Sequence, residues 1–546
     1  MSEGAAKKEE RRKFQAIKGT RDILPPETAL WNRVEQTAHE VFATFGFGEI
    51  RLPIIEETEL FARAVGGETD IVSKEMYGFP KKLEILRRAT TDQIDRVDHP
   101  SKIHMFAQSL AILVLNLEQA LNSSAIPTTE SNRHVIEQLK KISEQTIVLW
   151  RSLSWEPSRE WTEHFETARK LIKNLQIERL EESSSLRPEA TAGICRAYIE
   201  NNMQQLPQPV KLYCIGPMFR RERPQKGRYR QFYQIDAEVL EAVRKEVASG
   251  EWRVASKELA KDAAVDAEVI EMVMTLFDKL ELQGVQLAIN SIGDRNCRPK
   301  YVELLRAELS KVKDKLGPDS RRRIETNPLR VLDSKLESEQ KIIEKLPRIG
   351  DHLCEDCAAH YAAVKRELDL RGVKYHENWR LVRGLDYYMR TTFEITAKGL
   401  GSQNAVCGGG RYDGLVELLG GPPTKGIGFA IGEDRLILSL LETGHSPLAT
   451  RHSPLLYIAW MGEKAYATAI RAAKNLRNAG FPVELPPVEQ KFGKALGQAD
   501  KLGARFALIL GDNEVTSGQW TLKTLADGKQ EKLRESDLVE HLKKQL

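Results

Sequence analysis

The sequence concentrates positive charge in one short segment, RRERPQKGRYR at residues 220–230. The segment holds six cations and one anion, and the flanking sequences VKLYCIGPMF and RQFYQIDAEVL have the composition of β-strands. A guanidinium group binds phosphate oxygens through paired hydrogen bonds and stays charged at any accessible pH. The segment therefore predicts a turn that holds a polyphosphate, a solvated basic hairpin, or a loop that contacts an RNA backbone.

The strand after this turn carries acidic and amide groups. Because successive side chains of a strand point to opposite faces, one face is apolar and is expected in the core, while the other holds Gln234, Asp236 and Glu238. Gln234 and Glu238 lie ~13 Å apart along an ideal strand, so both reach one small ligand only through converging side chains. A face with acidic groups beside a basic turn suits a zwitterion placed next to a phosphate.

Two further segments carry polar groups. In LRPEATAGICRAYIE, Glu189 and Thr191 either face a ligand or cap the helix that follows, and capping is the better interpretation from this segment alone. In RLVRGLDYYMRTTFEI, Arg383 precedes a glycine turn. Tyr387 and Tyr388 are expected on opposite faces of the next strand, which would leave one of them in the core.

Regular elements must position these groups. Residues 29–47 have apolar side chains at helical spacing and end at a glycine, and residues 48–56 predict a strand interrupted by Pro53. The segments CGGGRYDGL and GIGFAIGEDRLIL contain glycines that allow the backbone to approach a neighbour closely. The second of them leads into a predicted helix that carries Arg435.

The length of 546 residues predicts several domains. Residues 1–13 form a charged tail without a secretory signal. Residues 80–183 show three apolar series at helical spacing and predict an inserted module of three amphipathic helices. From residue 453 onward, strand-like and helix-like segments alternate, which predicts an α/β domain with a mainly parallel sheet.

These segments, in this order, resemble the motifs of the class II aminoacyl-tRNA synthetases, and closely those of the histidyl-tRNA synthetase family. KGTRDILPPE resembles the family's opening signature, and IRLPIIEETELFARAVGGETDIVSKEMYGF its first class II motif. LRPEATA and MFRRERPQKGRYRQFYQIDAEV resemble the histidine loop and the second motif. LVRGLDYYMRTTFE resembles the histidine-specific motif, and GIGFAIGEDRL the third motif.

The resemblance implies an α+β catalytic domain on an antiparallel sheet over residues 14–445, followed by an α/β anticodon-binding domain over residues 453–546. The catalytic domain is interrupted by the helical insertion at 80–183 and by the family's own insertion domain at about 295–375. The implied reaction activates L-histidine with ATP to histidyl-adenylate and then transfers histidine to the 3′ end of its tRNA. No protein nucleophile is required.

The resemblance also implies which residues bind the substrates. Arg220 and Arg383 contact the α-phosphate as catalytic groups, and Arg435 completes the ATP site by packing on the adenine. The residues implied to bind histidine are Glu189, Ala190, Thr191, Arg220, Gln234, Glu238, Arg383, Tyr387 and Tyr388. Among these, Glu238 and Tyr388 are implied to read the imidazole ring, and Glu189, Thr191 and Gln234 to hold the α-ammonium group.

The implied partners are L-histidine, ATP with Mg²⁺, and a histidine tRNA. A homodimer is expected through the first motif around Pro53. The alternative is a catalytically inert paralogue that regulates histidine biosynthesis by binding histidine. That paralogue typically lacks the C-terminal domain and degrades the ATP motifs, whereas all three arginines and a terminal domain are present here.

Composition sets further limits. The net charge of +4 is modest, the longest apolar run is too short to span a bilayer, and six cysteines in this length suggest a reducing cytoplasm. The sequence HLCEDCAAH offers His352, Cys354, Cys357 and His360 as zinc ligands. It contains a single C-x-x-C with no second pair after it, and it has the pattern of a helix, so we predict no structural metal.

Overall fold

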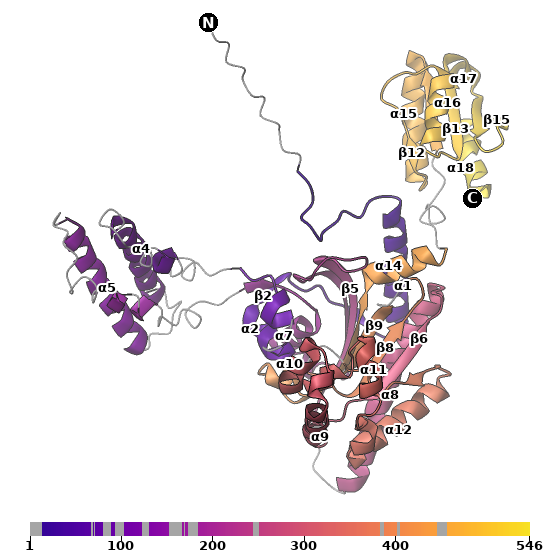
Figure 1. Cartoon of the computed structure of the whole chain (residues 1–546). Helices are drawn as coiled ribbons and strands as arrows, with labels where there is room; N and C mark the ends of the chain where they lie inside the picture. Colours follow the sequence, from indigo (N-terminus) through magenta and orange to yellow (C-terminus); the bar gives the residue numbers. More distant parts are fainter. Residues whose placement is uncertain are drawn as a thin grey trace. The chain divides into compact units, whose positions relative to one another are not determined.

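The computed structural model describes residues 14–66, 69, 71–79, 89–92, 103–122, 130–151, 166–168, 170–172, 184–243, 251–382, 387–400, 404–444 and 456–545. The chain divides into two compact units, one built mainly from residues 34–444 and the other from the residues after 444 together with Ile23–Arg33 (Figure 1). Among the described residues, no helix combines the length and the apolar composition needed to cross a bilayer.

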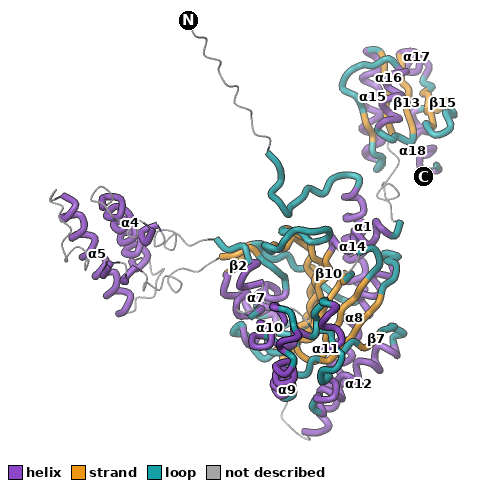
Figure 2. Tube along the Cα trace, viewed as in Figure 1, coloured by secondary structure: helices purple, strands orange, loops and turns teal. Residues whose placement is uncertain are grey.

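The larger unit is organised around an eight-stranded sheet, which Figure 2 shows in orange. Its strands, in spatial order, are β1 (Gly48–Glu49), β4 (Val210–Phe219), β5 (Gln231–Ala242), β10 (Thr424–Gly432), β9 (Ala405–Arg411), β8 (Met389–Thr396), β6 (Gln286–Ser291) and β7 (His376–Glu377). The two outermost pairs are parallel, and the pairs between them are antiparallel. The predicted antiparallel catalytic fold is therefore confirmed.

Strands β4 and β5 confirm the hairpin predicted around the cationic segment. Their register runs from Val210 opposite Leu240 to Phe219 opposite Gln231. The segment between them continues the pairing through Arg220, whose N–H donates to the carbonyl of Arg230 at 2.9 Å. The residues of β5 from 234 to 240 are buried, so the acidic face of this strand lies inside the unit rather than on its surface.

A helix packs against the sheet near its first edge strand, β1. The helix predicted at 29–47 is observed as α1 (Glu27–Thr44), and the ring of Phe42 packs 5.1 Å from that of Tyr213 on β4. The predicted strand at 48–56 is observed as two short strands, because Pro53 separates β1 from β2 (Ile55–Glu57). β2 pairs with β3 in a separate two-stranded sheet.

The remaining elements of this unit outside the insertions are short or lie against the sheet. They are β3 (Ser184–Leu186), α2 (Thr58–Val65), η1 (Ile71–Glu75), α7 (Thr191–Glu200), η4 (Met203–Gln205), α8 (Glu251–Lys279), α13 (Leu415–Leu418) and α14 (Glu433–Glu442). The helix predicted to carry Arg435 is thus observed as α14, which begins at Glu433 directly after β10.

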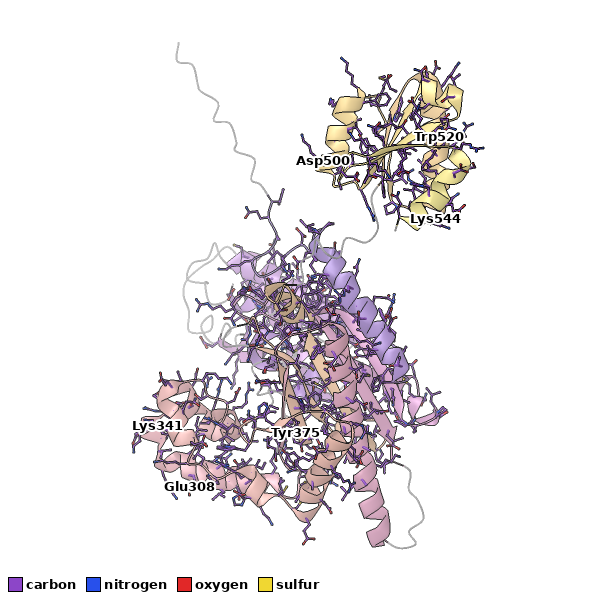
Figure 3. All side chains as sticks on the ribbon, turned by 90° about the vertical axis from the view of Figure 1, so that its right-hand side faces the viewer. Glu308, Lys341, Tyr375, Asp500, Trp520 and Lys544 are labelled. Carbon is purple, nitrogen blue, oxygen red and sulfur yellow. The ribbon has the colours of Figure 1, made fainter. Side chains whose placement is uncertain are left out.

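Residues 295–375 form four α-helices, of which Figure 3 labels Glu308 on α9 and Lys341 on α11. The helices are α9 (Arg298–Lys311), α10 (Pro318–Thr326), α11 (Glu337–Ile343) and α12 (Glu355–Leu370), with short turns η5 (Lys313–Lys315), η6 (Pro328–Val331) and η7 (Ile349–His352) between them. Their apolar core includes Tyr301, Leu305 and Ile324, and it also includes Tyr388 from the segment before β8. This region therefore packs directly against a predicted site residue.

The predicted helical module at 80–183 contains α4 (Ile103–Asn122) and α5 (Glu130–Arg151), which pack against each other (Figure 1). The apolar series at 106, 110, 113 and 117 is fully buried, as its spacing predicts. Of the third predicted helix, residues 166–168 and 170–172 are described and are helical. Much of the rest of this segment lies outside the described residues.

The C-terminal unit has its own five-stranded sheet, in the order β12 (Val483–Glu484), β11 (Leu456–Met461), β13 (Phe506–Gly511), β14 (Trp520–Thr524) and β15 (Gln530–Leu533). The prediction of a mainly parallel sheet is wrong, because β14 and β15 form an antiparallel hairpin that extends the parallel β12–β11–β13 core. Trp520, which begins this hairpin, is buried (Figure 3). The helices are α15 (Glu463–Asn478), α16 (Phe492–Lys501), α17 (Asp512–Ser517) and α18 (Glu535–Lys544).

Candidate active site

A cavity of about 320 Å³ lies against the eight-stranded sheet. Its lining comes from segments that are far apart in the sequence: the start of α7, the β4–β5 turn, β5 itself, the residues before β8, and the β10–α14 junction. Among the residues predicted from the sequence, those that line it are Glu189, Thr191, Arg220, Gln234, Tyr387, Tyr388 and Arg435. The fold thus brings most of the predicted set around one cavity.

Arginines form one side of this cavity. The Nε atom of Arg220 donates to the carbonyl of Pro188 at 2.9 Å, and its guanidinium lies 5.2 Å from the ring centroid of Phe232. Arg435 donates from Nη1 to the carbonyl of Ala405 at 2.9 Å. Burial, and next the charge of Arg228, lowers the pKa of Arg435. These contacts fix both guanidinium groups beside the cavity, where an anionic ligand would relieve their mutual repulsion.

The acidic side of the lining, made of Glu189, Gln234 and Asp236, is buried. Asp236 is 1% exposed, and within the described residues neither its Oδ2 atom nor the Oε1 atom of Gln234 has a hydrogen-bond partner. Burial, followed by the charges of Glu238 and Glu189, raises the pKa of Asp236 well above its ordinary value. A buried carboxylate that the protein leaves unsatisfied is suited to receive a cationic group from a ligand.

Glu238 is not among the described residues that line the cavity, but its carboxylate contacts Thr191, which does line it. Its carboxylate accepts hydrogen bonds from Thr191 Oγ1 at 2.6 Å and from the hydroxyl of Tyr412 at 2.5 Å. Burial raises its pKa to about 8. The facing position on β10 is Gly428, where a Cβ atom would lie 1.5 Å from Glu238 Oε2. Glycine is therefore required there by the close approach of this carboxylate.

Glu189 combines the two roles that the sequence left open. Its carboxylate accepts the backbone N–H of Thr191 at 2.9 Å and of Ala192 at 3.0 Å, so it satisfies free donors at the start of α7. The same residue also lines the cavity. Ala190 is fully buried at the N-terminal end of α7 and is not among the lining residues of the described chain.

The two tyrosines differ from the sequence-based expectation. They precede β8 instead of lying within it, and both line the cavity, with ring centroids 4.7 Å apart. The expected opposite strand faces are wrong, because both tyrosines precede the strand, but the expectation of one core tyrosine is confirmed by Tyr388, which is 6% exposed and belongs to the core of the helical region 295–375. The Nη1 atom of Arg298 donates to the carbonyl of Tyr388 at 2.6 Å and helps to hold this segment. Arg383 lies outside the described residues.

Comparison with known proteins gives a consistent result. The family model described as histidyl-tRNA synthetase matches residues 157–436, and the model of an anticodon-binding domain matches residues 456–545. The chain is 42% identical to the histidine–tRNA ligase of Koribacter versatilis, with 97% of this chain and 96% of that protein covered. Identity to the Solibacter usitatus histidine–tRNA ligase is also 42%, covering 97% and 99%.

The chain belongs to the histidyl-tRNA synthetase family. A solved structure, apo histidyl-tRNA synthetase of S. aureus, superposes with a TM-score of 0.63 at 30% identity and covers 97% of this chain and all of that one. A second, from Nostoc, has a TM-score of 0.57 at 19% identity and supports the fold.

Within this family member, sequence reasoning missed residues that the structure places at the site. Tyr412 donates to Glu238, and Asp236 lines the cavity without a partner for one oxygen. The strand alternation put Asp236 on the correct face, so a signal for it existed. No pattern in CGGGRYDGL indicated Tyr412, because its contact depends on the pairing of β9 with β10.

The cationic turn is also tied to the start of the chain. The carbonyl of Gly19 accepts the N–H of Arg230 at 2.6 Å, and Arg21 pairs with Asp434 of α14 at 3.2 Å. Asp434 in turn accepts the N–H of Tyr233 on β5 at 3.0 Å. The opening signature therefore acts as a strap across the turn and α14.

Proposed function

We propose that this chain is a histidine–tRNA ligase, which activates L-histidine with ATP and transfers it to the 3′ end of a histidine tRNA. One observation carries the proposal: a single cavity is lined by Arg220 and Arg435, its basic side, and by an acidic side on which Asp236 Oδ2 and Gln234 Oε1 have no hydrogen-bond partner among the described residues. Histidine has an ammonium group for the acidic side, and ATP has phosphates for the basic side. Membership of the family supports the same reaction.

In the first step the carboxylate of histidine attacks the α-phosphorus of ATP, and pyrophosphate leaves. Both reactants are anions, so catalysis requires their alignment and the neutralisation of their charge. Arg220 is proposed to bridge the carboxylate and the α-phosphate, with Arg383 acting on the same phosphate. Arg435 is proposed to hold the adenine and the outer phosphates. Glu222 and Glu394, which line the cavity, offer carboxylate oxygens of the kind that Mg²⁺ prefers when it accompanies ATP.

Selection of histidine is proposed to rest on the acidic side. Glu189, Thr191 and Gln234 would hold the α-ammonium group. A neutral imidazole presents one N–H and one lone pair, so a carboxylate and a hydroxyl can read it together. Glu238 and Tyr388 are the proposed pair, with Tyr387 and Ala190 shaping the slot. The contacts of Glu238 with Thr191 and Tyr412 already fix the position of its carboxylate.

The second step needs the tRNA. The C-terminal unit matches an anticodon-binding domain and exposes Lys494, Lys501 and Arg505, which suit phosphate contacts. A homodimer is proposed through the first motif, where Ile54 and Ile55 beside Pro53 expose 43% and 53% of their surface. We also propose that the protein acts in the cytoplasm.

Histidine-dependent exchange of pyrophosphate into ATP tests the first step. We expect exchange with L-histidine and none with other amino acids, followed by charging of histidine tRNA. The regulatory paralogue would bind histidine but give no exchange. Tight histidine binding without exchange, measured on the full chain with ATP and Mg²⁺ present, would therefore overturn the proposal in favour of that alternative.

A further inference from the structure

Three cysteine thiols and one carboxylate meet outside the cavity, at the base of the helical region 295–375. Asp294 and Cys297 belong to the turn after β6, and Cys354 and Cys357 stand at the start of α12. Their ligand atoms all lie within 4.8 Å of one another, and three of the four residues are buried. All six cysteines of the chain are described and are free thiols, so the three that converge here are not held by a disulfide.

Two of the distances between these atoms match those of a tetrahedral metal site. With Zn–S bonds of about 2.3 Å and Zn–O bonds of about 2.1 Å, neighbouring ligand atoms in a tetrahedron lie roughly 3.5–3.8 Å apart. The Asp294 Oδ1 atom lies 3.6 Å from the sulfur of Cys297 and 3.8 Å from that of Cys354. The remaining pairs of ligand atoms lie within 4.8 Å of each other.

Both halves of the cluster lie where a helix begins. Each half is a pair with two residues between its members. Asp294 and Cys297 both precede α9, whereas Cys354 directly precedes α12 and Cys357 lies in its first turn. Gly293 adopts φ +64°, and a Cβ atom there would approach the sulfur of Cys297 to 2.7 Å. The first turn is thus shaped to bring its ligands together.

The chemistry of the donor set selects the ion. Sulfur ligands favour Zn²⁺ over Mg²⁺ and Ca²⁺, which prefer oxygen. Binding would release the protons of the thiols that become thiolates. Three thiolates and a carboxylate exceed the charge of Zn²⁺, and Arg390 supplies a further positive charge, with its Nη2 atom 3.4 Å from Asp294 Oδ2.

We propose that these two pairs bind one structural Zn²⁺ ion through Asp294, Cys297, Cys354 and Cys357. The Asp294–Cys297 pair precedes the C-x-x-C pattern by about 60 residues and contains one cysteine, so the pattern alone does not indicate it. The two histidines of HLCEDCAAH do not belong to the cluster. His360 lies 3.4 Å from Asp266, and the ring of His352 packs 5.9 Å from that of Tyr301.

The ion would also steady the tyrosine segment of the cavity. The N–H of Arg390 donates to the carbonyl of Gly293 at 2.7 Å, and Arg298 donates to the carbonyl of Tyr388 at 2.6 Å. Gly293 is adjacent in the chain to the ligand Asp294, and Arg298 is adjacent to the ligand Cys297. Zinc would therefore join the turn after β6 and the start of α12 to the segment that carries both tyrosines.

The first test is the zinc content of the purified full chain, measured by mass spectrometry after exposure to Zn²⁺ and gel filtration. We expect one zinc ion per chain in the wild type, a loss in Asp294→Ala and Cys297→Ala, and full content in the matched control His352→Ala. Zinc-free wild type overturns the proposal. A chain that loses zinc with His352→Ala but keeps it with Cys297→Ala overturns the assigned ligands.

A second test covers variants that fold poorly. Cys357 is fully buried, whereas Cys354 is partly exposed, so Cys354→Ser is the variant least expected to disturb folding, which circular dichroism checks. Replacement of zinc by Co²⁺ should give the sulfur-to-cobalt charge-transfer absorption, weaker in Cys354→Ser and unchanged in His352→Ala. Chelation should increase hydrogen exchange at residues 293–298 and 387–391. Unchanged absorption in folded Cys354→Ser would contradict the assignment, whatever the outcome of the exchange assay.

Discussion

Two groups of buried charge in the larger unit are built in opposite ways. Asp266 on α8 is fully buried, and its carboxylate accepts hydrogen bonds from Arg411 Nη2 at 2.6 Å and from Thr391 Oγ1 at 2.6 Å. The carboxylates of Asp236 and Glu238 are equally buried, but burial raises the pKa of each. The protein supplies Asp266 with a cationic partner, whereas Glu238 accepts only hydroxyl hydrogen bonds and Asp236 keeps one oxygen atom without a partner among the described residues.

The difference distinguishes a buried charge that joins parts of the fold from buried carboxyl groups that have no counter-charge. A buried charge that has a partner contributes little net stability, but the removal of its partner is strongly destabilising. A buried carboxyl without a counter-charge lowers stability, and such groups are found where binding or catalysis requires them. The Asp266–Arg411 pair joins α8 to β9 and thereby fixes the sheet.

The largest expected effect comes from breaking the paired group. Arg411→Met leaves the carboxylate of Asp266 buried with its main partner removed, and we expect a loss of about 3–5 kcal/mol in the free energy of unfolding. Urea unfolding of the full chain measures it. The double variant Asp266→Leu with Arg411→Met should recover part of the loss. Equal stability of wild type and Arg411→Met would remove the distinction between the two groups.

The next effect concerns Glu238, in the group of carboxylates without a cationic partner. Glu238→Gln removes the charge but keeps the shape, so an imidazole N–H loses its carboxylate acceptor. We expect a loss on the order of 1–3 kcal/mol, or roughly 5–150-fold, in histidine-dependent exchange. The KM for ATP should change far less. An equal loss for both substrates would refute the role of Glu238 in reading the imidazole.

The same variant also tests the comparison through the pH dependence of the free energy of unfolding. The pKa of Glu238 is raised from 4.5 to about 8 in the folded chain, so the folded state favours the neutral carboxyl. Its stabilising contribution is complete below the unfolded value and is lost as pH rises towards about 8. Between pH 5 and pH 8 the wild type should therefore lose stability relative to Glu238→Gln, by up to about 1.4 kcal/mol per pH unit. Urea unfolding of the ligand-free proteins at several pH values measures this, and parallel pH profiles would contradict it.

The smallest effects come from two threonines, one in each group. Thr391→Val removes a donor to Asp266, and we expect a loss of about 1 kcal/mol in stability with unchanged use of histidine. Thr191→Val removes a donor to Glu238, which should raise the pKa of that carboxyl further and weaken histidine binding. Calorimetric titration with histidine distinguishes them. If both variants weaken binding equally, the groups are not functionally separate.

Local patterns in the sequence predicted much of the fold. Helix α1, the β4–β5 hairpin and helix α14 follow from apolar spacing and from a glycine-rich junction. These elements are determined by residues close together in the chain, so local physics suffices. The C-terminal hairpin β14–β15 was missed because its short strands contain polar residues, although Asp527–Gly528 in the connection between them is a local turn signal.

The site was predictable to the extent that its residues belong to recognisable motifs. Alternation alone could place Asp236 on the right face. Whether its Oδ2 atom finds a hydrogen-bond partner among the described residues depends on which strand packs beside it. Tyr412 and the Asp294–Cys297 pair depend on contacts between segments far apart in the chain. Such pairings are fixed by the sheet order, which no local pattern contains.

Gly428 has a consequence for attempts to redirect this enzyme family member to another amino acid. The long side chain at 238 occupies the volume that any side chain at 428 would need. A shorter residue at 238 would leave a void, and a larger one at 428 would collide unless 238 shrinks at the same time. Because the side chains at the two positions share one volume between neighbouring strands, libraries that aim to change specificity should vary both positions together.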